Sequence, residues 1–465
     1  MLDATGLAEA IAAGAISASD ALERLCGEIA ARNSALNAIV VSDIDRARMA
    51  AAAADRRLRA GERLPLLGVP ITIKESFDVA GLPTNWGLAA YRDAIARTDA
   101  VAVARLRQAG AVVVGKTNVS EGLAGWHATN PVYGRTHHPL NADWTPGGSS
   151  SGAAAAVAAG LSYLDIGSDL GGSIRGPSHF CGIFGHMATH GLIPLRGHVL
   201  DGRLAPLDIS SPGPMARSAR DLARALLAMA GPDANEAAGY RLALRQARHD
   251  ACKDFRVLVL DAHPMVPTDP SVRGAVTELA GRLANAGAKV ERAERIIPDI
   301  RKLTETYIAL LGTALSIGQT EAEAARLRER VSDLASDDDT IAAQRLRAAT
   351  MSHAAWVRAN ETRFELRWAW QRVFENHDAV ICPPCIVPAL AHAEAAGATL
   401  TVNGQTIDAE DNIAWAAVAS CCGLPATTMP VTISGEGKPL GVQIIGPYLE
   451  DLTPIALARL AGDGG

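Results

Sequence analysis

The sequence has few aromatic residues, no strong excess of charge and no long apolar run. Aromatic side chains make up 4% of its 465 residues, and the net charge is −6 at pH 7. No uninterrupted apolar stretch reaches the roughly 18 residues that a membrane-spanning helix needs. The N-terminal stretch MLDATGLAEAIAAGAIS has early acidic residues and no basic region before its apolar positions, so it is a poor signal peptide. We therefore expect a cytoplasmic protein whose partners include neither nucleic acid nor a membrane.

The seven cysteines do not indicate a disulfide framework or a complete metal site. Cys382 and Cys385 make a CPPC motif, but no second CxxC or HxxxH motif is present to complete a zinc site. No thioredoxin-like alternation of strands and helices surrounds the motif. We interpret DAVICPPC as the end of a buried strand, and we expect neither a metal nor another cofactor.

Strand-like and helix-like stretches alternate along most of the chain. Ser17 and Asp20 resemble a capping box, LLGVPITIK and AVVVG are strand-like, and SSGAAAAVAAG is helix-like. This alternation predicts an α/β fold with a large, mixed but mostly parallel central sheet that helices cover on both faces. From about residue 271 to 376 the pattern is almost wholly helical, which predicts a helical layer or cap. Because no long linker interrupts the chain, we expect residues 1–465 to form one domain.

Two glycine turns that carry serine, and a lysine upstream of both, are the strongest chemical signal in the sequence. The first turn is PGGSSSG with Ser149, the second is GSDLGGSIRGP with Ser173, and the lysine is Lys74 in LGVPITIKESFDV. Glycines just before a serine let several backbone N–H groups converge on one developing oxyanion. A lysine kept neutral by burial can act as the base that activates a serine. This set predicts a serine hydrolase that does not use histidine.

A match to the Walker A pattern of nucleotide-binding loops, GAVVVGKT, runs from Gly110 to Thr117, and VLVLD ending at Asp261 resembles a Walker B strand. A phosphate-binding loop follows its strand, whereas here the three valines between the glycines must themselves form the strand. β-Branched residues also do not easily take the turn that wraps a phosphate. We therefore do not expect a nucleotide site at this segment.

The first serine turn also fits a different hydrolase motif. GSSSG, from Gly148 to Gly152, matches the G-x-S-x-G nucleophile elbow with Ser150 as the nucleophile. An elbow needs a strand directly before it, but HHPLNADWTPG is polar, contains proline and is loop-like. Aspartates and histidines do follow in the chain, so an α/β-hydrolase-type esterase that uses Ser150 stays an alternative.

The run from PGGSSSGAAAAVAAG to DIGSDLGGSIRGPSHFCGIFG resembles the signature of the amidase signature family of serine hydrolases. LGVPITIKESFDVAGLPT and GKPLGVQIIGPYLED are similar to that family's strands, and the likeness is strong over residues 66–217 and moderate over 378–451. The resemblance implies the family's fold and an amidase with a Ser–cisSer–Lys triad. In it Ser173 is the nucleophile, Ser149 after a cis peptide bond is the bridging serine, and Lys74 is the base. It also implies an oxyanion hole made by the backbone N–H groups of Leu170, Gly171, Gly172 and Ser173.

The residues around the second turn bear on the substrate. Asp169 and Arg175 flank Ser173 with opposite charges, and we interpret them as a pair that braces the loop rather than as an anchor for an acidic substrate. In place of the family's lysine-proline segment this sequence has GHMATHGLIP, with His186 and His190. No carboxylate or cysteine set stands beside these histidines at ligand spacing, so we interpret them as loop residues.

No motif specifies the substrate itself. Trp86, Trp126 and Tyr133 lie between the lysine strand and the first serine turn, where they would line an apolar pocket or pack in the core. The pocket interpretation predicts a small aryl or aliphatic amide as the substrate, with esters as side substrates. Because the resembled family also contains glutamine-hydrolysing subunits of amidotransferase complexes, such a role in a larger complex stays an alternative. A homodimer also stays open.

Overall fold

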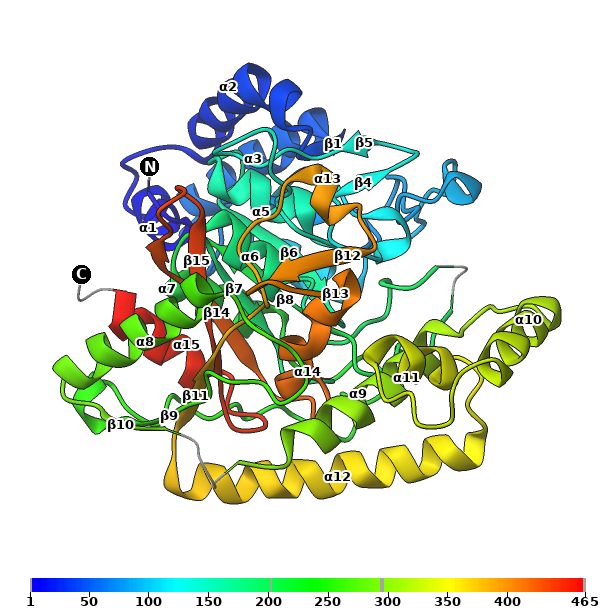
Figure 1. The fold of residues 1–465 in the computed structure, drawn as a ribbon. Helices are drawn as coiled ribbons and strands as arrows, with labels where there is room; N and C mark the ends of the chain where they lie inside the picture. The colour runs from blue at the N-terminus through cyan, green and yellow to red at the C-terminus, as the bar shows by residue number, and fades with distance from the viewer. Residues whose placement is uncertain (1, 201–202, 293–296, 463–465) are drawn as a thin grey trace.

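An eight-stranded mixed sheet forms the centre of the molecule (Figure 1). The computed structural model describes residues 2–200, 203–292 and 297–462. The strands of the sheet are β6 (Leu164–Asp169), β7 (Phe184–Met187), β8 (Ser211–Ala216), β9 (Arg256–Val259), β10 (Lys289–Arg292), β11 (Ala379–Cys382), β14 (Ala426–Ile433) and β15 (Pro439–Ile445). Their order across the sheet is β10-β9-β11-β15-β14-β7-β8-β6.

A three-stranded sheet carries the lysine that the sequence analysis singled out. It consists of β1 (Ile39–Ser42), β2 (Pro70–Lys74) and β3 (Val112–Thr117), in the order β1-β3-β2. β2 and β3 are parallel, and Lys74 lies opposite Thr117. β3 includes the valines and the Gly-Lys-Thr of the Walker-like match, so this segment is a strand and not a phosphate-binding loop. Two short hairpins are formed by β4 (Thr129–Asn130) with β5 (Gly134–Arg135), and by β12 (Thr399–Val402) with β13 (Gln405–Asp408).

Helices connect the strands of both sheets. The α-helices of the described residues are α1 (Ala4–Ala12), α2 (Ala18–Leu36), α3 (Ile44–Arg59), α4 (Val101–Gln108), α5 (Ser151–Ala158), α6 (Arg175–Cys181), α7 (Ala219–Met229), α8 (Pro270–Asn285), α9 (Ile300–Leu315), α10 (Glu321–Ser332), α11 (Ile341–Ala348), α12 (His353–Asn376), α13 (His392–Ala395), α14 (Ala414–Ser420) and α15 (Leu452–Gly462). Short 3₁₀ helices are η1 (Ala89–Tyr91), η2 (Glu121–Leu123), η3 (Cys252–Asp254) and η4 (Ala409–Ile413). Ser17 opens α2 as expected, because its hydroxyl accepts a hydrogen bond from the backbone N–H of Asp20 at 2.9 Å.

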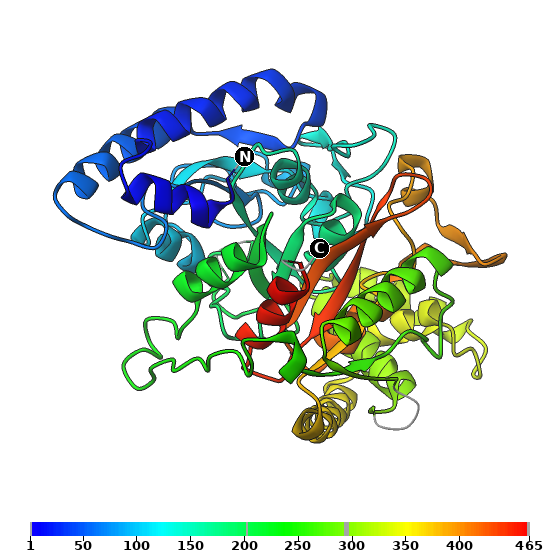
Figure 2. The same cartoon turned by 90° about the vertical axis from the view of Figure 1, so that its left-hand side faces the viewer.

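Helices cover the central sheet on both faces, as predicted. Successive side chains of a strand point to opposite faces, so each strand contributes to two separate cores. Val257 and Val259 of β9 pack in the core that includes α7, α8 and α15, which lie on the side facing the viewer in Figure 2. Leu258 and Leu260 pack instead with α9, α12 and α14.

The expectation of a mostly parallel sheet is wrong. Among the described strands of the central sheet, only β10–β9 and β9–β11 are parallel neighbours, whereas β11–β15, β15–β14, β14–β7, β7–β8 and β8–β6 are antiparallel. β6 and β7 run in the same direction on either side of α6, but β8 lies between them and is antiparallel to both. The sequence of β8, SPGPMA, does not indicate a strand. Proline has no backbone N–H to donate to a neighbouring strand, and it is depleted in strands. β14 and β15 form a hairpin, and adjacent hairpin strands are antiparallel.

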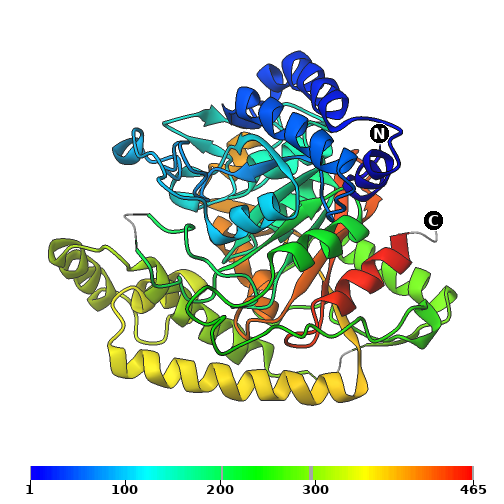
Figure 3. The same cartoon turned by 180° about the vertical axis from the view of Figure 1, so that it is seen from behind.

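The described residues between about 271 and 376 are mostly helical, but they include one strand that the sequence did not indicate. α8 packs on the central sheet, and β10 then adds an edge strand to it. α9 packs against both α11 and α12, and α12 runs along the lower edge of the molecule (Figures 1 and 3). A single domain over residues 1–465 stays a prediction.

The CPPC motif follows a buried strand. β11 ends at Cys382, and the side chains of Cys382 and Cys385 are both buried, which confirms the structural interpretation of DAVICPPC. Among the described residues, no helix combines the length and the apolar character needed to cross a membrane.

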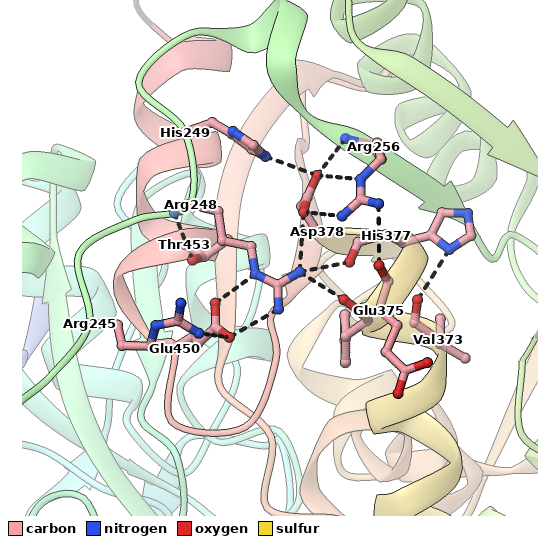
Figure 4. A network of polar contacts seen from close by, with 11 residues as sticks. Arg245, Arg248, His249, Arg256, Val373, Glu375, His377, Asp378, Glu450 and Thr453 are labelled. Atoms are coloured by element: carbon pink, nitrogen blue, oxygen red, sulfur yellow. Dashed lines mark hydrogen bonds and ion pairs between the residues drawn. The ribbon is translucent and has the colours of Figure 1, made fainter.

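A buried ion network ties the segment before β9 to the start of β11 (Figure 4). Asp378, whose side chain is 1% exposed, accepts hydrogen bonds from Nη2 of Arg256 at 2.9 Å and Nη1 of Arg248 at 3.1 Å. Arg248 also donates through Nε to Glu450 at 2.7 Å. Burial alone would raise the pKa of Asp378, but the hydrogen bonds from Arg256 and Arg248 outweigh it and lower the pKa to about 2. The network anchors the stretch around Arg248, which has no regular secondary structure.

We expect Asp378→Ala to lower the free energy of unfolding by about 3 kcal/mol at pH 7, because two arginines lose a buried carboxylate. A lowered pKa stabilises the fold only while the carboxylate is charged, so this contribution persists at neutral pH and disappears as the pH falls from about 4 towards 2. Denaturant unfolding of both proteins at several pH values measures it. As a control, Glu23→Ala removes an ion pair with Arg48 in which both side chains are exposed, and it should cost less than about 1 kcal/mol. Equal losses in the two variants would contradict a special role for the network.

Candidate active site

Lys74 and Ser149 meet at the end of β2. The side chain of Lys74 is fully buried, and its Nζ lies 2.8 Å from Oγ of Ser149. Nζ also lies 2.9 Å from Oγ and 3.3 Å from the carbonyl oxygen of Ser168. The Gly148–Ser149 peptide bond is cis, as the family resemblance implies. The sequence analysis missed Ser168, whose only signal is its place at the end of a strand just before the second glycine turn.

The surroundings of Lys74 favour its neutral form. Burial lowers the pKa of Lys74 to about 7, and the nearby charges of Asp169 and Asp165 only partly oppose this effect. A neutral amine has two N–H donors and one lone pair. The carbonyl and hydroxyl oxygens of Ser168 can accept both donors, which leaves the lone pair for the hydroxyl of Ser149. Lys74 can therefore accept a proton from Ser149 in this arrangement.

Asp169 holds the glycine turn that carries Ser173. Its carboxylate accepts hydrogen bonds from the backbone N–H groups of Gly172 at 2.8 Å and Ile174 at 2.9 Å. It also pairs with Arg175 at 2.8 Å, and both side chains are completely buried. The sequence-based interpretation of this pair as a brace is confirmed. Because Arg175 is buried and paired, it does not offer its charge to a substrate.

The backbone around Ser173 can supply an oxyanion hole, but not from all the predicted donors. The N–H of Gly172 is committed to Asp169, so it is not free to bind an oxyanion. Leu170, Gly171 and Ser173 line the pocket, and their N–H groups make no hydrogen bond within the described residues. Gly172 takes a left-handed backbone conformation with φ of 98°, which glycine adopts without strain. The structure thus leaves three candidate donors on the pocket side of the turn.

Both serines open into one pocket of about 170 Å³, which is lined mainly by apolar side chains. Ser149 and Ser173 share its wall without a direct hydrogen bond between them in the described structure. The apolar lining consists of Trp86, Leu123, Ala124, Trp126, Leu170, Leu207, Leu311, Leu315 and Ile413. The charged lining residues Arg345 and Glu410 pair with each other, so they do not leave an unbalanced charge. The pocket therefore suits an uncharged, largely apolar molecule.

Two residues of the sequence analysis do not line this pocket. The hydroxyl of Tyr133 instead donates to Glu75 at 3.1 Å and accepts from the side-chain amide of Asn85 at 2.7 Å. Ser150 is fully buried at the N-terminus of α5, where its hydroxyl faces the carbonyl oxygen of Ser168 at 3.4 Å. No strand precedes Ser150 directly, so the nucleophile-elbow alternative is wrong.

The histidine in the pocket is not a suitable base. Burial, together with the charge of Lys74, lowers the pKa of His198 to about 3, and its Nε2 lies 3.0 Å from the hydroxyl of Ser76. Its ring packs against Phe77, with 4.3 Å between the centroids. The interpretation of His186 as a loop residue is also wrong. His186 lies on β7, buried, with Nε2 3.1 Å from Asp451, a partner too distant in sequence to be predicted.

Asp165 is a second buried carboxyl whose charge acts on Lys74, and the sequence analysis missed it. Its Oδ2 accepts hydrogen bonds from the hydroxyls of Thr72 at 2.5 Å and Thr117 at 3.0 Å. Its Oδ1 has no hydrogen-bond partner within the described residues. Burial raises the pKa of Asp165 to about 7, against the effect of the threonine hydrogen bonds. The charge of Asp165 in turn raises the pKa of Lys74.

We expect Asp165→Asn to shift the rising limb of the pH profile of kcat/KM to lower pH, by roughly one unit, because Lys74 loses a nearby negative charge. The measurement is kcat/KM for one amide between pH 5 and 9 in both proteins. Thr117→Val is the matched control, since it removes a hydrogen bond to Asp165 but no charge. An unchanged limb in Asp165→Asn with normal folding would show that Asp165 does not influence the titration of Lys74.

Comparison with known proteins supports one family over nearly the whole chain. The profile of the Amidase family matches residues 20–453. An indoleacetamide hydrolase of Bradyrhizobium diazoefficiens is 34% identical, with 99% of this chain and 86% of that protein covered. A glutamyl-tRNA(Gln) amidotransferase subunit from Deinococcus radiodurans is 31% identical, with 91% of this chain and 89% of that protein covered.

A similar solved structure comes from an inhibitor-bound vestigial protein complex, described as revealing the evolutionary origins of an s-triazine catabolic enzyme. It is 29% identical to this chain, with a TM-score of 0.83 over 99% of this chain and 98% of that one. The sequence relatives, the shared fold and the serine turns beside a buried lysine all indicate the same family. The chain belongs to the amidase signature family of hydrolases.

Proposed function

We propose that this protein hydrolyses a small, uncharged carboxylic amide through an acyl-enzyme on Ser173, with Ser149 and Lys74 as its proton relay. The observation that carries the proposal is the 2.8 Å contact between Nζ of Lys74 and Oγ of Ser149, whose hydroxyl opens into the pocket that holds Ser173. A buried lysine with a pKa of about 7 is in good part neutral at neutral pH, as a general base must be.

The reaction follows from the positions of these groups. Ser173 attacks the amide carbon while its proton passes to Ser149, and the proton of Ser149 passes to Lys74. The N–H groups of the glycine turn stabilise the oxyanion. The C–N bond then breaks as the relay returns a proton to the leaving nitrogen, which leaves an ester on Ser173 and a neutral amine. Water attacks that ester, loses a proton to the same relay, and releases the carboxylic acid with the proton returned to Ser173.

The shape and chemistry of the pocket support an apolar acyl group of roughly aromatic size. Trp86 and Trp126 supply two indole surfaces, and the remaining apolar lining is aliphatic. Arg175 is buried against Asp169, so it would not bind a substrate carboxylate beside Ser173. The similarity to an indoleacetamide hydrolase supports the same class of arylalkyl amides.

A panel of amides tests this proposal with the isolated protein. We expect indole-3-acetamide, phenylacetamide and hexanamide to be hydrolysed, with kcat/KM for the best of them at least about 100-fold above that for glutamine, because the charged α-ammonium and α-carboxylate groups of glutamine would lose their hydration in an apolar pocket. Ammonia release and acid formation should be equal. Glutamine as the preferred substrate would instead favour a role within an amidotransferase complex, which the similarity to the Deinococcus radiodurans protein leaves as the second candidate.

A further inference from the structure

The outward face of α12 carries an apolar stripe. Val357, Phe364 and Trp368 are 47%, 42% and 65% exposed. Residues spaced by four, seven and eleven lie on one face of a helix, so these three form a continuous line along α12. Figures 1, 2 and 3 all show α12 at the lower edge of the molecule, with no other ribbon below it.

The flanks of α12 hold the helix so that this stripe faces away from the molecule. On one flank Glu365 pairs with Lys302 of α9 at 3.1 Å. On the other flank Arg363 pairs with Asp208 at 2.7 Å. Trp370 is fully buried on the inward side. The exposed apolar line is therefore a fixed feature of the surface and not the result of a loosely attached helix.

Four exposed charged residues border the stripe, in contrast to the paired charges on the flanks. None of them forms an ion pair within the part of the chain that the structure describes. They are Arg358, Glu361, Arg372 and Glu375. A basic and an acidic residue thus stand towards the start of the helix, and another basic and acidic residue towards its end.

We propose that α12 is the interface of a homodimer, in which the helices of two copies pack antiparallel about a two-fold axis near Leu366 and Arg367. About this axis Glu361 lies opposite Arg372 of the second copy, and Arg358 lies opposite Glu375 of the second copy. Both pairs have the same midpoint in the sequence, so one axis satisfies both. The axis repeats each pair, which gives four ion pairs around the apolar centre.

The same axis brings the aromatic residues of the two stripes together. Phe364 lies opposite Trp368 of the second copy, within one residue of the same midpoint. Trp368 of each copy then buries a large apolar surface against the stripe of the other copy. Central aromatic residues of this kind contribute most of the binding energy of many interfaces. A parallel arrangement would instead place like charges opposite each other, so the charge pattern selects the antiparallel one.

The size of the contact predicts a weak dimer. The span from Arg358 to Glu375 is about 26 Å at 1.5 Å per residue. One pair of helices of this length buries an area at or below the roughly 1,200 Å² low end of specific interfaces. We therefore expect a monomer–dimer equilibrium that depends on protein concentration.

Sedimentation equilibrium of the full chain over a concentration series tests the proposal. The wild type should show a monomer–dimer equilibrium, and Trp368→Glu should raise the dissociation constant by about 30-fold or more, as loss of a central aromatic anchor does. Glu361→Arg and Arg372→Glu should each weaken the dimer by about tenfold or more, because like charges then face each other. The double variant Glu361→Arg/Arg372→Glu should regain most of the affinity.

Mixing the two single charge variants gives the sharpest result. Each copy then meets opposite charges on the other, so the mixture should form a heterodimer although neither variant dimerises well alone. Arg326→Glu on α10 is a matched control that reverses an exposed charge away from the stripe and should leave the dimer unchanged. A wild type that stays monomeric at every concentration would overturn the proposal. So would a dimer that Trp368→Glu and both charge reversals leave intact.

Discussion

Ser173→Ala should lower kcat/KM for the best amide substrate by on the order of 10⁴-fold or more, because the variant has no nucleophile to form the acyl-enzyme. The fold should be unaffected, since the substitution removes one partly buried hydroxyl from a turn that the buried Asp169–Arg175 pair holds. Steady-state kinetics and circular dichroism at the same pH measure both properties. Any residual hydrolysis should come only from substrate binding and from the backbone N–H groups of the glycine turn, which still stabilise the oxyanion.

A covalent label separates this expectation from its alternatives. A fluorophosphonate should add one adduct per chain in the wild type, peptide mapping should place it on Ser173, and Ser173→Ala should take up none. Ser150→Ala is the matched control in the first serine turn, because Ser150 is buried away from the pocket and should not be labelled. Labelling of Ser150, or unchanged labelling of Ser173→Ala, would contradict the assignment of the nucleophile.

The sequence could bring out Lys74, Ser149 and Ser173 as candidates because they lie in long, specific segments. Lys74 comes at the end of an apolar strand, and both serines lie in glycine-rich turns. Few structures other than an oxyanion-binding turn need glycines at these positions. Ser168 and Asp165 could not be predicted in the same way. Their roles depend on how β6 lies against β2 and β3, and a single buried serine or aspartate in a strand carries no local signal.

The errors have physical causes of the same kind. Tyr133 and Trp126 lie in neighbouring loops, so the sequence alone makes them equal candidates for the pocket. The hydroxyl of Tyr133 instead donates a hydrogen bond to Glu75, and only Trp126 lines the pocket. His186 lies buried on a strand, where its ring contacts Asp451, a residue far along the chain. The sheet was expected to be mostly parallel because helices separate its predicted strands, while the proline-rich β8 was not recognised as the antiparallel strand between β6 and β7.

Lys74→Met should abolish most of the activity and at the same time stabilise the fold at pH 7. Loss of general base catalysis typically costs on the order of 10²–10⁴-fold in rate, and no other base lies within hydrogen-bond distance of Ser149 in the described residues. The stability gain has a separate cause. The pKa of Lys74 falls from 10.5 in the unfolded chain to about 7 in the folded protein, so between these values the unfolded chain binds the extra proton.

The sign of the stability effect follows from that proton. Because the unfolded wild type binds more protons between pH 7 and 10.5, its free energy of unfolding rises with pH across this range, and below about pH 7 the full cost of burying the lysine remains. Methionine carries no such cost, so Lys74→Met should be more stable than the wild type by about 1–4 kcal/mol at pH 7, and this difference in stability should narrow towards pH 10.

Lys116→Met is the matched control. Lys116 is also buried, with its pKa lowered to about 8, but it donates to Thr84 and not to Ser149, so this variant should keep its hydrolytic activity within about tenfold. Wild-type activity in Lys74→Met, or a stability difference that does not change with pH, would show that Lys74 is not the buried, neutral base of this site.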